Sequence, residues 1–129
     1  MQNAKVKMQN EKEKFKKDFI RRLIRFSLKI VNICEQLRID RKFWIICEQL
    51  IRCATSIGAN VVEAKSSSSR RDYIRFFEIA LKSANETKYW LILIREMMIE
   101  KKQIELLLEE VDEISKIIGS SLLTLKGKK

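Results

Sequence analysis

Residues 73–98 read YIRFFEIALKSANETKYWLILIREMM, and their inward-facing positions recur at alternating intervals of four and three residues. These positions are Tyr73, Phe77, Ala80, Ala84, Thr87, Leu91, Ile94 and Met98. Because an α-helix turns once every 3.6 residues, this spacing places all of them along one face of a helix. A seven-residue repeat of this kind is typical of helices packed side by side in left-handed bundles. The pattern predicts a bundled helix over about 70–98.

Three further segments carry the same repeat, and together the four predict the fold. Their stripes are Phe19, Leu23, Phe26, Ile30, Ile33 and Leu37; Phe43, Cys47, Leu50, Ala54, Ile57 and Val61; and Ile104, Leu107, Val111, Ile114, Ile118, Ser121 and Leu125. Short links make consecutive helices antiparallel. We predict a single-domain, all-α, up-down-up-down antiparallel four-helix bundle with helices at about 13–37, 42–65, 70–98 and 102–125. Since both chain ends are polar, we expect residues 1–12 to form a flexible basic leader and 126–129 a frayed basic tail.

The composition excludes several classes of protein. The 129 residues include no histidine, no proline and three glycines. Without histidine, Ser-His-Asp and Cys-His catalysis and His-bearing zinc or di-iron sites are removed. The cysteines Cys34, Cys47 and Cys53 form no C-x-x-C motif, so we expect small buried side chains rather than disulfides or metal ligands. We predict no enzymatic activity, no catalytic residues, no metal or cofactor and no small-molecule substrate.

The hydropathy pattern favours a cytoplasmic protein. The longest unbroken apolar run is Tyr89–Ile94, far short of the roughly 20 residues that span a bilayer. The opening residues are not followed by an apolar stretch of signal-peptide length. Because the inner face of the first helix is needed for the core, we expect no membrane partner.

Positive charge is concentrated in the first helix and its leader. The chain has 27 Lys and Arg against 17 Asp and Glu, and residues 1–42 hold 13 basic and five acidic residues. Lys14, Lys17, Arg21, Arg25 and Lys29 fall within one sector of roughly 120°, opposite the apolar stripe. With Arg22, they are candidates to neutralise nucleic-acid phosphates without reading bases. The alternative is a solvated face that only keeps the protein soluble.

A second basic feature, Arg70-Arg71, follows the serine run 66–69. Ser69 is placed to cap the third helix, with Asp72 three residues later. Free amides, hydroxyls and guanidinium groups together could hold a phosphate. The alternative is an ordinary capped helix start, which the negative charge of Asp72 favours.

Apolar residues outside the four stripes suggest an interface between copies. Ile20, Ile24 and Val31 flank the stripe of the first helix, and Ile74, Leu81 and Ile92 form a row on the third. Surplus apolar patches commonly mark an interface, so we predict a homo-oligomer. The alternative is that the third helix is simply the most buried member of the bundle.

Residues 52–64, RCATSIGANVVEA, place small and polar residues inside an apolar helix. Gly58 costs about 1 kcal/mol relative to alanine there, so it must permit a close approach or a bend. A hairpin turning near residues 67–68 brings Arg52 to Glu86 and Asn60 to the turn at 75–78, and Thr87 can bond to its own helix. We predict a structural polar network of Arg52, Ser56, Asn60, Glu63 and Glu86 that fixes the register.

Two blocks of residues are similar to a known family. They are Gln49-Leu50-Ile51-Arg52, Thr55-Ser56-Ile57-Gly58-Ala59-Asn60 and Glu63-Ala64, followed by Ser68, Asp72-Tyr73-Ile74, Ile79-Ala80-Leu81-Lys82 and Ala84-Asn85-Glu86-Thr87-Lys88-Tyr89-Trp90-Leu91. Over about 15–125 the chain resembles the bacterial four-helix-bundle family, also called the 23S rRNA intervening-sequence protein family, with Asn85 where many relatives carry aspartate. The resemblance implies a homopentamer around a central channel, encoded within insertions in large-subunit rRNA genes. A related branch, the accessory variability determinant (Avd) of diversity-generating retroelements, binds its reverse transcriptase and nucleic acid.

These observations lead to two functional hypotheses. The first is a non-enzymatic homo-oligomer, pentameric as the resemblance implies, that binds RNA or DNA through its basic outer face without base-specific readout. The second is a protein-interaction adaptor, such as the accessory subunit of a retroelement reverse transcriptase.

Overall fold

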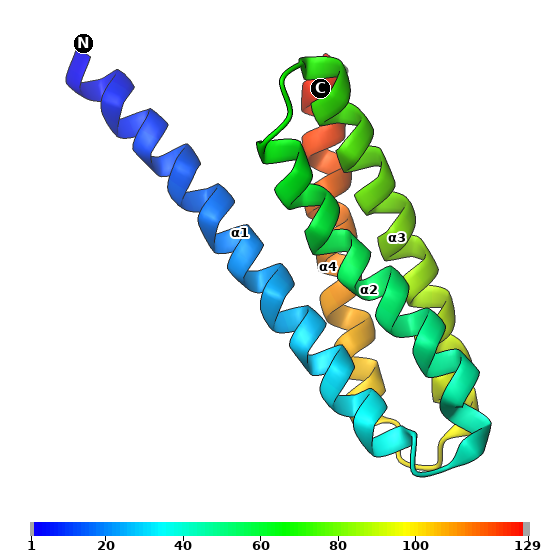
Figure 1. The fold of residues 1–129 in the computed structure, drawn as a ribbon. Coiled ribbons are helices and arrows are strands. Elements are labelled where there is room, and N and C mark those ends of the chain that lie inside the picture. Colours follow the sequence, from blue (N-terminus) through cyan, green and yellow to red (C-terminus); the bar gives the residue numbers. More distant parts are fainter. Residues whose placement is uncertain (1, 128–129) are drawn as a thin grey trace.

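A computed structural model describes residues 2–127, and it consists of four helices and one short 3-10 turn (Figure 1). The elements are α1 (Gln2–Leu37), η1 (Arg41–Phe43), α2 (Trp44–Lys65), α3 (Arg70–Met97) and α4 (Lys102–Leu125). Met1, Lys128 and Lys129, which belong to the predicted leader and tail, lie outside the described residues.

The helices form the predicted bundle. Each helix packs against the next in the chain, and α1 also contacts α4, which closes the arrangement. The α1–α2 and α3–α4 connections lie at one end, and the α2–α3 connection lies at the other (Figure 1). The prediction of an all-α four-helix fold is therefore confirmed, and the helix starts and ends from residue 37 to residue 125 agree with it to within two residues.

The core is built from the four predicted stripes. The largest fully buried side chains include Leu23, Ile30, Leu50, Ile57, Leu91, Ile94, Val111 and Ile118. Burial of each such side chain is worth roughly 1.5–3 kcal/mol, so packing of the stripes supplies most of the stability. The stripes lose their burial at their ends, where Tyr73 and Leu125 are half-buried.

Gly58 lies where α2 and α1 approach each other closely. A Cβ atom added at this position would stand 3.4 Å from the Cβ of Leu23 on α1. The glycine therefore faces α1, but 3.4 Å is an ordinary van der Waals contact, so the packing of α1 against α2 does not by itself require glycine at this position.

The start of α3 is capped by a side chain. Ser69 is extended, and its hydroxyl accepts a hydrogen bond of 3.1 Å from the backbone N–H of Asp72. The predicted cap is confirmed, and it satisfies one of the amides that a helix start leaves free.

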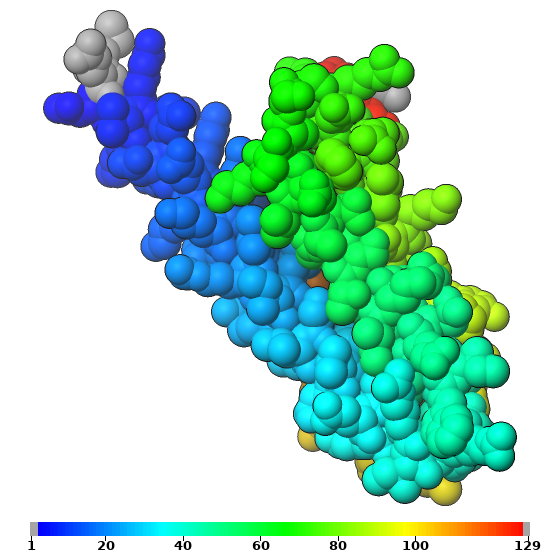
Figure 2. Space-filling model, viewed as in Figure 1, coloured from blue at the N-terminus to red at the C-terminus, as the bar shows by residue number. Residues whose placement is uncertain are grey.

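The first helix begins eleven residues earlier than predicted. Residues 2–12 continue α1 as a helix, and residues 3–18 are exposed. This segment stands away from the other helices, and a hollow separates it from the end of α2 (Figures 1 and 2). Because it contains lysine, glutamate, glutamine and methionine without glycine or proline, helix propensity alone favours the helical state.

The surplus apolar residues divide into two groups. Ile20, Ile74 and Leu81 pack against the core of their own chain, and Val31 is half-buried. By contrast, Ile24 is 53% exposed and Ile92 is 42% exposed. Part of the predicted interface therefore serves the bundle itself, because α3 is flanked by helices on both sides.

One stretch, Arg41–Lys65, is long and apolar enough to cross a bilayer by length and composition. Seven of the α2 side chains within it are buried in the bundle: Cys47, Leu50, Cys53, Ala54, Ile57, Val61 and Ala64. Since this apolar stripe is already used in packing, we interpret the stretch as a core helix.

Candidate nucleic-acid interface

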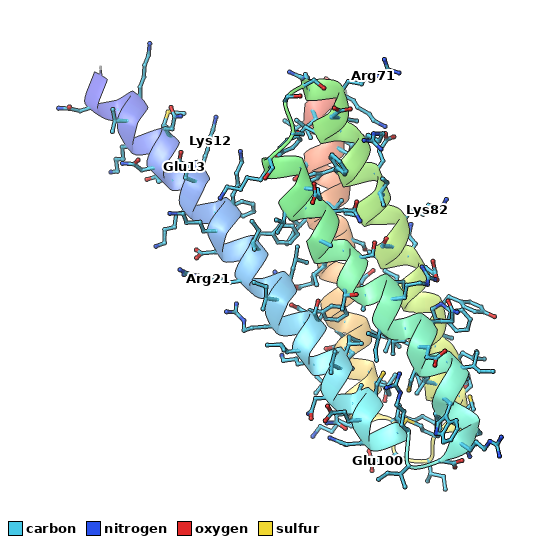
Figure 3. All side chains as sticks on the ribbon, in the orientation of Figure 1. Lys12, Glu13, Arg21, Arg71, Lys82 and Glu100 are labelled. Carbon is cyan, nitrogen blue, oxygen red and sulfur yellow. The ribbon has the colours of Figure 1, made fainter. Side chains whose placement is uncertain are left out.

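The outer face of α1 carries a row of exposed cations, which we call the outer basic row: Lys14, Lys17, Arg21, Arg25 and Lys29. Among residues 2–127, four of them have no carboxylate within 4.0 Å. Arg21, which projects from α1 in Figure 3, reaches Asp18 at 3.8 Å, with both side chains exposed. Such surface pairs contribute little, so the row presents almost its full positive charge to solvent.

Arg22 was grouped with these cations in the sequence analysis, but it lies inside an ion-pair cluster. Its guanidinium donates to Glu110 at 2.8 and 2.7 Å and to Glu113 at 2.6 Å, both on α4. The hydrogen bond from Arg22 lowers the pKa of the Glu110 carboxyl, and Glu110 and Glu113 raise the pKa of Arg22. Because its charge is matched within the chain, Arg22 holds α1 against α4 and is not available to a phosphate.

The outer basic row is not uniform along its length. The charges of Lys29 and Arg25 also help to lower the pKa of Glu110, which shows that the α4 carboxylate lies within their electrostatic reach. Lys14 and Lys17 lie further toward the N-terminal part of α1, where no shift in Glu110 is traced to them. The C-terminal end of the row therefore lies nearer to the Glu110 carboxylate of α4 than the N-terminal end does.

The Arg70-Arg71 feature is an ordinary helix start rather than an assembled phosphate site. The Arg70 guanidinium donates to the backbone carbonyl of Leu125 and so ties the start of α3 to the end of α4. The Ser69 hydroxyl is occupied by the cap, and Ser67 donates to the Ala64 carbonyl at 2.6 Å. Arg71 projects into solvent at the end of the bundle (Figure 3).

The predicted polar network is present between α2 and α3, with different members. Arg52 pairs with Glu86 and also donates to Gln49, while the indole of Trp90 donates to Glu86 at 3.1 Å. Gln49 and Trp90 were not among the predicted members, although each stands three or four residues from one of them on the same flank of its helix.

A second part of the network lies deeper. The Ser83 hydroxyl donates to that of Ser56 at 3.0 Å, and Thr87 donates to its own helix at the Ser83 carbonyl at 2.8 Å. The Asn60 amide donates to Ser56 rather than to the turn at 75–78. Glu63 is exposed and makes none of these bonds. The Ser83–Ser56 hydrogen bond and the Arg52–Glu86 pair therefore link α2 to α3, while the Thr87 bond stays within α3.

The cysteines are part of the core. Cys34, Cys47 and Cys53 are free and buried, and burial raises the pKa of each thiol. Raised thiol pKa values leave little thiolate, the reactive form. Within residues 2–127 no three side chains of the cysteine, aspartate and glutamate types gather as metal ligands.

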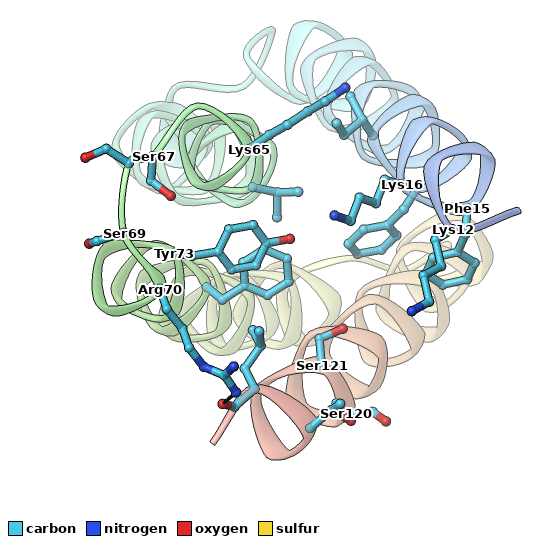
Figure 4. Close-up of a pocket in the computed structure, with 17 residues that line it drawn as sticks. Lys12, Phe15, Lys16, Lys65, Ser67, Ser69, Arg70, Tyr73, Ser120 and Ser121 are labelled. Atoms are coloured by element: carbon cyan, nitrogen blue, oxygen red, sulfur yellow. Dashed lines mark hydrogen bonds between the residues drawn. The ribbon is translucent and has the colours of Figure 1, made fainter. Parts of the chain in front are cut away.

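A cleft that the sequence did not predict opens on the inner side of α1, on the face opposite the outer basic row. It has a volume of about 720 Å³ and lies between the N-terminal half of α1 and the nearby ends of α2, α3 and α4 (Figure 4). Its described lining residues include Lys12, Lys16, Lys65 and Arg70 and no carboxylate. The cleft forms because the N-terminal half of α1 diverges from the bundle alongside the ends of α2, α3 and α4 (Figure 1).

The fold and these surfaces define a class of protein: a small, basic four-helix bundle with an extended first helix. Residues 15–120 match the 23S rRNA-intervening sequence protein family, and the chain belongs to that family. The first residues of α1, 2–14, precede the matched region, and we call them the extension.

A solved structure of a related protein supports this assignment. A crystal structure from Bacteroides thetaiotaomicron VPI-5482, of a protein with unknown function from the S23 ribosomal protein family, is 37% identical to this chain. It superposes with a TM-score of 0.76 over 81% of this chain and 97% of that chain. None of the curated proteins compared with the chain is similar to it.

Proposed function

We propose that this protein is a non-enzymatic, self-associating scaffold that binds nucleic acid through the outer basic row of α1. The observation that carries the proposal is a line of five exposed cations on α1, of which, among the described residues, Arg21 alone has a carboxylate within 4.0 Å, in a solvent-exposed pair with Asp18. From position 14 to position 29 the helix rises about 22 Å. That length matches roughly six phosphates along one strand, so several cations can be neutralised together.

The proposed recognition is by charge and not by base sequence. Lysine and arginine side chains on the convex outside of a helix reach phosphates and carry no sequence information by themselves. Five phosphate contacts predict that the logarithm of the association constant falls with the logarithm of salt concentration with a slope of about −4.5 for duplex DNA. Affinity should change little when the base sequence is changed at constant length.

Two matched triple variants test the role of the row. Lys14→Gln/Lys17→Gln/Arg25→Gln removes three cations from it, and Arg71→Gln/Arg75→Gln/Lys82→Gln removes three exposed cations from α3. We expect the first to lower affinity for duplex RNA or DNA by at least about tenfold at low salt, and the second to have a much smaller effect. Equal losses would show that only net charge matters, and no loss in either would contradict the proposal.

Self-association is supported by apolar side chains that remain exposed on α1 and α3. Ile24 on α1 and Ile92 on α3, both predicted interface residues, are 53% and 42% exposed. A pentamer, which family resemblance implies, would bring five basic rows to one strand and raise the avidity. Light scattering tests this: we expect an oligomer that Ile24→Glu/Ile92→Glu dissociates, whereas a monomeric wild-type protein would contradict it.

The end of the bundle that holds the α1–α2 and α3–α4 connections favours the adaptor hypothesis as a second candidate. Ile39, Ile45 and Ile99 are among the most exposed apolar side chains, and they lie in or beside the connections at this end (Figure 1). Co-purification with a reverse transcriptase, lost in Ile39→Ser/Ile45→Ser, would support an adaptor. Unchanged co-purification would exclude this surface.

A further inference from the structure

The cleft at the N-terminal half of α1 has an aromatic wall. Tyr73 and Phe77 on α3 stack with ring centroids 5.0 Å apart and an interplanar angle of 16°. Phe15 and Phe19 line the cleft from α1, and Phe15 remains largely exposed. Exposed aromatic rings in a groove are platforms on which nucleobases can stack.

The rim of the cleft is positive. Lys12 and Lys16 on α1 and Lys65 at the end of α2 line it, and the lining residues that the structure describes include no carboxylate. The Lys16 ammonium points inward and lies 5.8 Å from the centroid of the Tyr73 ring (Figure 4). Cations beside aromatic faces suit a ligand that is anionic and aromatic at once.

The repeat of α1 shows which kind of occupant fits. Its core stripe continues from Phe19 through Phe15, Lys12, Met8 and Lys5 at the same intervals of four and three residues. Here the side chains are exposed rather than packed against another helix, and lysines occupy two positions that hold apolar residues further along α1. An apolar helix docking here would have to bury those charges, which is costly, whereas a phosphate backbone would neutralise them.

We propose that this cleft binds unpaired nucleotides of a single strand, with bases against Tyr73 and Phe15 and phosphates on Lys12, Lys16 and Lys65. The inference rests on the proposed nucleic-acid binding and names the substrate form that the protein prefers. A volume of about 720 Å³ lies within the range of ligand-binding pockets. Bases in a duplex are stacked on their neighbours and cannot reach the aromatic wall, whereas unpaired bases can.

A matched pair of double variants separates the cleft from the outer basic row. Lys12→Gln/Lys16→Gln and Lys14→Gln/Lys17→Gln remove the same charge from the same segment of α1, on opposite faces. Fluorescence anisotropy with an oligothymidylate and a duplex of equal length gives the ratio of the two affinities. We expect the cleft variant to lower that ratio several-fold and the outer variant to leave it unchanged. The same ratio in both variants would overturn the inference.

The aromatic wall is tested with the two tyrosines of the chain. Tyr73→Leu keeps an apolar side chain in the cleft and removes its accessible ring, while Tyr89→Leu changes an exposed tyrosine elsewhere on α3. We expect Tyr73→Leu to weaken single-strand binding by about tenfold with little effect on duplex binding, and Tyr89→Leu to change neither. Thermal melts followed by circular dichroism establish that both variants fold.

Photochemical crosslinking makes the test independent of folding effects. An oligonucleotide that carries 5-iodouracil, irradiated with the full-length wild-type protein, should link to Tyr73 or Phe15. Crosslinks to aromatic residues outside the cleft, such as Trp44 or Tyr89, without any to Tyr73 or Phe15 would overturn the cleft proposal while leaving the proposed function intact. Absence of salt-dependent binding to any strand would instead contradict the proposed function itself.

A second copy of the chain is the competing occupant. If it filled the cleft, Lys12→Gln/Lys16→Gln would change the mass measured by light scattering without changing the ratio of single-strand to duplex affinity. That result would also overturn the inference. An unchanged mass together with a lowered ratio is the result we expect.

Discussion

The two parts of α1 share one repeat and have different surroundings. From Phe19 to Leu37 the stripe is apolar at every position and is buried against α2 and α4. Before Phe19 the same intervals continue with Phe15, Lys12, Met8 and Lys5, and the side chains are exposed. The comparison teaches that helix formation and burial are separate properties: propensity favours the helix in both parts, but apolar partners bury only one.

The largest predicted effect comes from truncating matched apolar side chains in the two parts of α1. Leu23 is 1% exposed, and Leu23→Ala should destabilise the fold by about 2–5 kcal/mol because it leaves a cavity. Met8→Ala, in the extension, should change the free energy of unfolding by less than about 0.5 kcal/mol. Urea denaturation measures both, and a large loss in Met8→Ala would mean that the extension is packed in solution.

A smaller effect is expected where α1 is held to α4. Arg22→Gln leaves the half-buried Glu110 without its guanidinium partner and should cost about 1 kcal/mol at neutral pH. Arg25→Gln, on the exposed outer face, is the control and should cost almost nothing. Comparable losses in the two variants would contradict the distinction between matched and unmatched cations.

The destabilisation by Arg22→Gln should also depend on pH. Arg22 lowers the pKa of Glu110 in the folded state, so the pair stabilises the protein above the ordinary glutamate pKa of about 4.3. This stabilisation is lost as the pH falls through the lowered value. The difference between wild type and variant should therefore shrink in acid, as urea titrations across this range would show, and a constant difference would refute the assignment.

The smallest effects concern two glycines inside helices. Gly119→Ala meets nothing within 4 Å and should gain up to about 1 kcal/mol from helix propensity. Gly58→Ala gains the same propensity, but its Cβ would contact Leu23 at 3.4 Å, so its net gain should be smaller, about 0.5 kcal/mol. Thermal melts rank the two, and a larger gain at Gly58 would mean that α1 and α2 are not held close there.

The fold was largely predictable because each stripe is a local pattern. The register of Leu23, Leu50, Leu91 and Val111 follows from spacing alone, and their burial was expected. The extension was missed because its helical state rests on propensity without an apolar stripe, and polar chain ends are commonly frayed.

The sites were less predictable because they depend on neighbours distant in sequence. Spacing places Arg22 on one flank of α1, but only the packed bundle shows that Glu110 and Glu113 face it. The cleft depends on where α1 leaves the bundle, which no local pattern states. A signal was nevertheless present, since Lys5 and Lys12 occupy positions that continue the apolar repeat.

The salt dependence of binding tests the central claim, which is that the outer basic row of α1 binds nucleic acid by charge. For the wild-type protein and duplex DNA we predict a log–log slope of about −4.5, and for Lys14→Gln/Lys17→Gln/Arg25→Gln a slope weaker by about 2.7 units. A slope that is the same in the two proteins, or wild-type binding that does not respond to salt, would contradict it.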